Sequence, residues 1–212
     1  MDRDDRRRLA FAVGLTAVAG YVDAVGFLKV GHLFVSFMSG DSTQLAVAAA
    51  RANWSEMGAA GGVIALFVLG VIAGRILSRA MKHRYRAAVL PIEAILLASA
   101  ALLQTSATMV IVPMVLAMGL QNAALHKVGD IKTSLTYVTG TLVNFGENLA
   151  DAFGTSDPQQ RWAWVPYLLL WLGLILGAAF GAMFYQMLQL SALFIPATAL
   201  IILATVASSM PP

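Results

Sequence analysis

GYVDAVGFLKVGHLFVSFMSGD, residues 20–41, and GLQNAALHKVGDIKTSLTYVTGT, residues 119–141, are two versions of one motif. In each copy a polar side chain follows the first glycine by three residues, Asp23 in one and Asn122 in the other. The second half of each copy contains a hydroxyl residue followed by glycine, and the surrounding sequence is largely apolar. A duplicated membrane unit with polar groups of this kind usually has a site at the interface between its repeats.

Composition assigns the chain to the membrane proteins. Hydrophobic residues make up 59% of its 212 residues, charged residues make up 12%, and the mean hydropathy is +0.76. A soluble domain of this length could not bury so much apolar surface. Cysteine is absent, which excludes a disulfide framework, a thiolate metal site and a cysteine nucleophile. The basic residues that give the net charge of +3 cluster beside apolar segments, so we expect them to orient helices rather than to bind nucleic acid.

Eight apolar segments follow one another in two sets of four. A helix needs roughly 20 mostly apolar residues to cross the hydrocarbon core. The candidates are 9–28, 33–50, 58–77, 87–105, 109–126, 133–150, 163–187 and 190–208. The second and sixth are short and polar, so we predict broken or re-entrant helices there. The predicted fold is an all-α integral membrane protein with six full spans plus two broken segments, forming one compact membrane domain of two repeats, 1–105 and 106–212.

Loop charge predicts how these repeats are oriented. If all eight segments crossed, the basic loop at 79–86 would lie outside while the arginine-rich N-terminus lay in the cytoplasm, against the positive-inside tendency. If the second and sixth segments enter and leave on one side, that loop and both termini are cytoplasmic. The second unit then begins outside, and the repeats are inverted. Full crossing by both segments would make the repeats parallel instead.

The N-terminus imitates a secretory signal, because Arg6–Arg8 precede an apolar run and the small residues Ala17-Val18-Ala19. The apolar run continues to Leu28, and the first copy of the motif begins at Gly20. We therefore expect this segment to be retained as the first span.

Small residues four apart predict close helix packing in the third and seventh segments. Gly70 and Gly74 recur as Gly173 and Gly177, and such spacing lets helix backbones approach closely in lipid. We expect these helices to pack together or on matched partners. The alternative is that glycine is simply common in membrane helices.

The glycines near the ends of the two motif copies predict interruptions in the second and sixth segments. Glycine permits backbone angles closed to other residues, and a neighbouring hydroxyl or carboxylate can cap the next helical turn. Short helices at 41–50 and 141–150 would point their positive N-terminal ends toward the middle of the protein, where they attract polar or anionic solutes. The negative charge of Asp41 argues against an anion in the first half. The candidate solute-binding residues are Asp23, Asn122, Ser39, Gly40, Asp41, Thr139, Gly140 and Asn144.

Asp23 and Asn122 occupy matching positions in the first and fifth segments. A carboxylate within a span is costly unless it faces a cavity or a partner, and only Asp23 of the two can titrate. One interpretation is a solute site with one protonatable half. The other is structural, with each side chain accepting hydrogen bonds from free backbone amides of the neighbouring broken segment.

Two further polar features have alternative interpretations. Asn144 shares a helical face with Glu147 and Asn148, which could line an aqueous path or belong to a helix end wetted by the cytoplasm. Glu93 lies in the fourth segment, about two turns from the basic cluster at 79–86, and we expect it to extend toward those charges or to pair with them rather than to serve transport.

Known catalytic patterns are absent from the sequence. It has no HExxH, GxSxG, P-loop or dinucleotide glycine pattern. His32, His83 and His126 each lack a second ligand at helical spacing. We expect no metal site, no cofactor and no enzymatic activity.

The motifs GYVDAVGFL, FVSFMSG and MGLQNA…TYVTGTL, in this order and separation, resemble the YoaK-like bacterial transmembrane proteins, domain of unknown function 1275. The resemblance covers residues 9–208 and implies a small multi-pass protein of the bacterial cytoplasmic (inner) membrane, without supplying an activity. The family pattern at the first break resembles T-G-N, whereas this chain has Ser39-Gly40-Asp41, which adds a negative charge.

These observations lead to one functional hypothesis and two alternatives. The first is a channel or secondary transporter for a small polar or ionic solute, with a site at the repeat interface. The second is a membrane scaffold or partner subunit that transports nothing, and the third is an intramembrane enzyme. The expected partners are the lipid bilayer and a small solute or ion, with a homo-oligomer as a further option.

Overall fold

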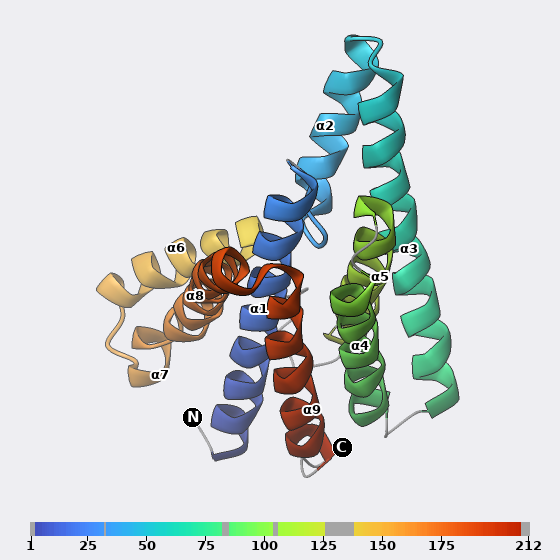
Figure 1. Ribbon diagram of the computed structural model, residues 1–212. Helices are drawn as coiled ribbons and strands as arrows, with labels where there is room; N and C mark the ends of the chain where they lie inside the picture. Colours follow the sequence, from blue (N-terminus) through green and yellow to red (C-terminus); the bar gives the residue numbers. More distant parts are fainter. Residues whose placement is uncertain (1–2, 32, 82–84, 104–105, 126–137, 209–212) are drawn as a thin grey trace.

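The computed structural model describes residues 3–31, 33–81, 85–103, 106–125 and 138–208, which are helical apart from short connections (Figure 1). The helices are α1 Arg3–Val30, α2 Met38–Ala50, α3 Trp54–Met81, α4 Tyr85–Leu102, α5 Ala107–Leu125, α6 Val138–Gly154, α7 Pro158–Arg161, α8 Val165–Leu188 and α9 Phe194–Ser208, with a 3-10 turn η2 at Gln189–Leu193 between the last two. Each predicted apolar segment contains a helix over most of its described length. Residues 104–105, 126 and 133–137 of the predicted fourth, fifth and sixth segments lie outside the described residues.

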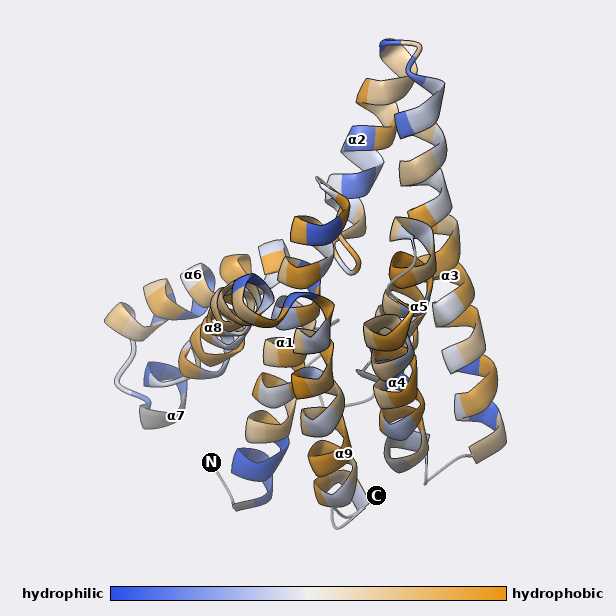
Figure 2. Ribbon diagram, in the orientation of Figure 1, coloured by the Kyte–Doolittle hydropathy of each residue, from blue (hydrophilic) through white to orange (hydrophobic). Residues whose placement is uncertain are grey.

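The helices are those of a membrane protein. Three described stretches are long and apolar enough to cross a bilayer, Asp4–Val30, Trp54–Met81 and Val165–Ser208, the last of which contains α8, η2 and α9. Shorter apolar helices occur at Ala88–Leu102 and Ala107–Ala123, within α4 and α5. Figure 2 shows hydrophobic residues along most of the bundle, with hydrophilic residues gathered toward helix ends and along α2 and α6.

Glycines bring α1 and α8 into backbone contact. Gly173 of α8 lies against Val13 of α1, and Gly177 lies one turn further along against Ala17. An added Cβ at Gly177 would collide with the Ala17 carbonyl group. Because both sequence numbers increase along the contact, the two helices run parallel.

A second glycine contact joins α3 and α5. Gly70 of α3 lies against Gly119 of α5, and Gly74 lies against Ala123, so these helices are also parallel. The predicted glycine stripes thus pack on matched partners, α5 and α1, rather than on one another.

Helix pairing is symmetric when α1, α2, α3 and α4 are exchanged with α5, α6, α8 and α9. The α1–α8 pair becomes α5–α3, the α2–α3 pair becomes α6–α8, and the α4–α9 pair is unchanged. In Figure 1, α1 and α4 run toward one end of the molecule while α3, α5 and α9 run toward the other. The first described residues of α1, the end of α3, the start of α4 and the last described residues of α9 lie at the same end.

The apolar core lies where α1, α4, α5 and α9 meet. Its largest fully buried apolar side chains include Leu15, Leu97, Met114, Met118 and Leu200. This core sets the positions of the inner helices relative to one another, and the polar groups described below pack against these helices.

Candidate functional site

Asp23 binds the non-helical segment that precedes α2. Its Oδ1 accepts hydrogen bonds from the backbone amides of Val35 and Ser36, each at 2.8 Å. Its Oδ2 accepts from the Ser36 hydroxyl. Since α1 ends at Val30 and α2 begins at Met38, these amides have no helical carbonyl to bind, and the carboxylate supplies their acceptor.

Asp41 extends the same arrangement from the other side. Its Oδ1 accepts from the backbone amide of Phe34 at 3.0 Å. Phe34, Val35 and Ser36 therefore donate three consecutive amides to two carboxylates. The Asp41 side chain is 0% exposed, and its Oδ2 has no hydrogen-bond partner among the described residues.

The two carboxylates of this arrangement lie near each other, with Asp41 buried and Asp23 half-buried. Asp23 and Asp41 are close enough to interact electrostatically, and like charges in a poorly solvated place repel each other strongly. The positive end of α2 offsets part of that charge, because Asp41 lies in its first turn. We call Asp23, Asp41 and the amides of residues 34–36 the carboxylate clasp.

The first interruption lies slightly earlier in the chain than predicted. We predicted a break at Ser39–Asp41 with a helix from residue 41, whereas α2 begins at Met38 and includes these residues in its first turn. The reason is that Asp23 and Asp41 satisfy the amides of residues 34–36, so regular helix can begin directly after Phe37.

Gly40 makes room for an aromatic cluster rather than adopting an unusual backbone angle. An added Cβ would lie 2.8 Å from the Phe37 ring and 3.2 Å from the Phe34 ring. The Phe34 and Phe37 rings pack edge to face at a centroid distance of 5.4 Å. Ser39 is exposed beside them and takes no part in the clasp.

The second half holds its predicted polar residues differently. Asn122 is buried and donates from Nδ2 to the Met118 carbonyl of its own helix at 2.9 Å. The segment equivalent to residues 34–36 falls within 126–137, outside the described residues. The predicted pairing of Asn122 with that segment therefore stays a prediction.

Helix α6 begins at Val138, so Thr139 and Gly140 are in its first turn, as Ser39 and Gly40 are in α2. Thr139 is exposed, Gly140 and Asn144 are half-buried, and the Asn144 carbonyl accepts from Asn148 Nδ2 at 2.7 Å. Thr141 is buried and lines a pocket of about 10 Å³, about the size that one water molecule requires. The lining residues are Thr16, Val138, Thr141, Leu170, Trp171 and Leu174.

Two functional candidates in the core were not predicted. Thr16 of α1 lines this pocket together with Thr141. Gln121 donates from Nε2 to the Leu15 carbonyl at 3.2 Å, while its Oε1 has no partner among the described residues. The signal for Gln121 is its position beside Asn122 in the second copy of the motif. Thr16 precedes the first copy and gives no signal.

Our expectation for Glu93 is wrong. We predicted that it extends toward the basic cluster or pairs with it, but its side chain is 0% exposed. Both carboxyl oxygens lack a hydrogen-bond partner among the described residues. The helix face decides this outcome, because Leu90 and Leu97, three and four residues away, belong to the buried core.

Comparison with known proteins identifies relatives over most of the chain. The family described as "Protein of unknown function (DUF1275)" matches residues 11–206. UPF0700 transmembrane protein RA0705 of Rhizobium meliloti (strain 1021) is 35% identical over 204 residues, covering 96% of this chain and 87% of that protein. UPF0700 transmembrane protein YoaK of Bacillus subtilis (strain 168) is 30% identical over 145 residues, covering 64% of each chain.

No solved structure matches the chain. Because its relatives are transmembrane proteins and its own helices are long and apolar, the protein is embedded in a membrane. The family match extends over both copies of the motif and all the long helices, and the chain therefore belongs to the DUF1275 family.

Proposed function

We propose that the protein is a channel or secondary transporter for a small polar or ionic solute. The observation that carries this proposal is the carboxylate clasp, in which Asp23 and Asp41 hold three consecutive amides of a non-helical segment. Non-helical backbone at membrane depth is tolerated only where it is buried in protein or lines an aqueous cavity. Buried carboxylates in such a position mark ion or proton pathways in many membrane proteins.

The negative charge of the clasp favours a cation or a proton as one of the species that the protein binds or transports. Three amides and one hydroxyl do not neutralise two carboxylates, and Asp41 Oδ2 has no protein donor among the described residues. A bound cation or a proton would remove the repulsion between the two groups. We also include Ser39 and Gly40, from the first turn of α2, in the proposed site. Its members from the second half of the chain are Asn122, Thr139, Gly140 and Asn144.

We infer that the two halves are inverted repeats comprising six spans and two broken helices, α2 and α6. Exchange of the halves preserves helix pairing and reverses the direction of α1 relative to α5 and of α4 relative to α9, which supports this inference. We place the protein in the bacterial cytoplasmic membrane with both termini in the cytoplasm. The last turn of α3, which carries Arg79, lies at the same end as the first turns of α1, and this favours the orientation.

A non-transporting scaffold or partner subunit is the second candidate. The observation in its favour is that both oxygens of Asp23 already accept hydrogen bonds from the protein. In that case the clasp only connects α1 to α2. We propose no enzymatic activity for either candidate. The partners that we propose are the bilayer, a small solute or ion, and further copies of the chain.

Uptake into proteoliposomes tests the proposal. The panel would contain monovalent cations, small neutral metabolites and small anions, each offered with and without a pH gradient. We expect uptake of at least one solute by the wild type and its loss in Asp41→Asn, which removes the charge but keeps the side-chain shape. Asp4→Asn, at an exposed position near the start of α1, is the matched control and should transport normally.

Two results would decide against transport. One is that the wild type moves nothing above empty liposomes under any gradient. The other is that Asp41→Asn and Asp4→Asn transport equally well, which would leave the clasp as a tether alone.

A further inference from the structure

Glu93 is the most isolated buried acid among the described residues. It lies on the face of α4 that carries Leu90 and Leu97, both in the apolar core. Neither carboxyl oxygen has a hydrogen-bond partner among the described residues. A structural role does not account for this side chain, because an apolar residue of similar volume would fill the same position without the loss of hydration.

Few charged groups surround Glu93. Helices α5 and α9 and the turn η2 pack against α4, and over their described lengths they contain no titratable side chain. Helix α3 also contacts α4 and carries Arg75 and Arg79 in its last turns. On α4 itself, Tyr85 is close enough to interact electrostatically with both Glu93 and Arg75.

Tyr85 lies between the basic end of the bundle and Glu93. Its hydroxyl is buried without a hydrogen-bond partner among the described residues, and it lies 3.1 Å from the position of an added Cβ on Gly74 of α3. Eight residues separate Tyr85 from Glu93, which is about 12 Å along a helix. A proton passing between them therefore needs an intervening water molecule or a change in the helix.

Pro91 provides a point at which α4 can change. It lies inside the helix between Tyr85 and Glu93, and proline removes one backbone hydrogen bond and favours a bend. The sequence Pro91-Ile-Glu93 has a counterpart in α9, Pro196-Ala-Thr198, where the polar side chain is an exposed threonine. The acid is thus a feature of the first half alone.

We propose that Glu93 is an exchangeable-proton site, that Tyr85 relays the proton toward the Arg75 end of the bundle, and that this exchange drives solute movement. The last part rests on the transport function proposed above. Glu93 carries the proton while it is enclosed in the core and releases it when α4 opens toward Tyr85. The clasp binds the solute or ion, and Glu93 supplies the coupling.

The hydrophobic reagent N,N′-dicyclohexylcarbodiimide tests the proton site without any knowledge of the solute. It reaches acids within membranes and adds to the protonated carboxyl, so the modified peptide gains the mass of one reagent molecule. We expect modification at Glu93 in the reconstituted wild-type protein, with a yield that falls severalfold as the pH is raised. Glu93→Gln should lose this modification. In Tyr85→Phe, the modification yield at Glu93 should change severalfold more slowly after a pH jump.

Absence of modification at Glu93, or a yield independent of pH in protein shown to be folded, would overturn the proton site. The coupling role has a separate readout. If a solute is taken up, Glu93→Gln should transport it without accompanying proton movement, and unchanged proton movement in this variant overturns the coupling. If no solute is taken up, the proposed function and the coupling both fail, whereas the modification result still decides whether Glu93 exchanges a proton.

Discussion

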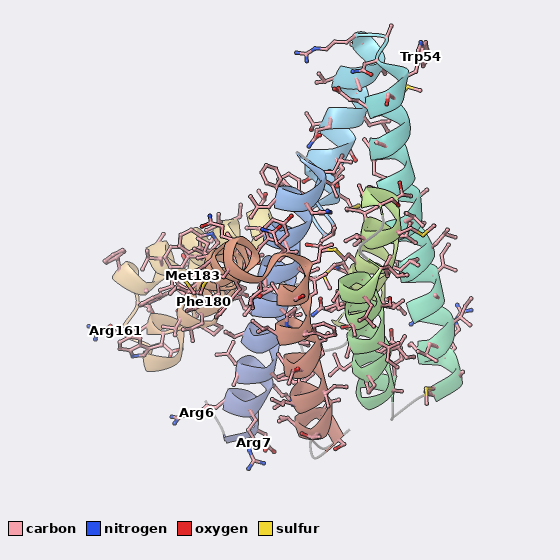
Figure 3. The ribbon with its side chains drawn as sticks, viewed as in Figure 1. Arg6, Arg7, Trp54, Arg161, Phe180 and Met183 are labelled. Carbon is pink, nitrogen blue, oxygen red and sulfur yellow. The ribbon has the colours of Figure 1, made fainter. Side chains whose placement is uncertain are left out.

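Asp23 of α1 accepts hydrogen bonds from both the amide and the hydroxyl of Ser36, which ties the interior of α1 to the non-helical segment before α2. A side chain in one helix thereby sets where the next helix begins. In Figure 3 the labelled Arg6 and Arg7 lie at one end of the bundle and Trp54 lies at the opposite end.

Removing the Asp23 carboxylate should destabilise the protein. Asp23→Ala leaves the buried amides of Val35 and Ser36 without acceptors, and we expect a loss of about 2–4 kcal/mol from two unsatisfied donors. Asp23→Asn keeps one carbonyl oxygen for those amides and should lose less. Thermal unfolding of the detergent-solubilised variants measures this order, and equal midpoints for wild type and Asp23→Ala would contradict it.

Close packing of α1 on α8 predicts intolerance of small additions. Gly177→Ala places a methyl group against the Ala17 backbone, and overpacking of this kind costs about 1–3 kcal/mol. Gly62→Ala, in open space on α3, is the matched control and should be neutral or stabilising by up to about 1 kcal/mol, because alanine favours helix over glycine. The same unfolding assay compares them, and equal effects of both substitutions would argue against the α1–α8 contact.

Side-specific labelling tests the direction of the helices. The chain has no cysteine, so single cysteines can be introduced at Asp4, Arg51 and Ala80, which are all exposed. If α2 enters and leaves on one side, a membrane-impermeant maleimide should label positions 4 and 80 from the same side and position 51 from the opposite side. Eight full crossings would instead place positions 4 and 51 together and position 80 alone.

The sequence was sufficient to predict the helices but not the exact helix starts. Apolar length locates all the long helices, because the lipid requirement acts on each segment independently. The start of α2 at Met38 depends on two carboxylates that satisfy the amides of residues 34–36. No local pattern reports such a contact between distant residues.

Side-chain surroundings were harder to predict than positions along the chain. Asp23 was recognised from the repeated motif, and its amide contacts match the structural interpretation of that residue. Glu93 was assigned to the basic cluster from its distance in sequence, but its position on the Leu90–Leu97 face turns it into the core. The hydropathy of the segment does not distinguish these two outcomes.

Whether the carboxylate clasp is a binding site or only a tether is most directly measured by the response of the melting temperature to cations. A ligand that binds only the folded protein raises that temperature as its concentration increases. We predict that Na⁺, K⁺ or Li⁺, or a fall in pH, stabilises the wild type, and that Asp41→Asn abolishes this response. Identical responses of the two proteins to every cation and to pH would contradict the account.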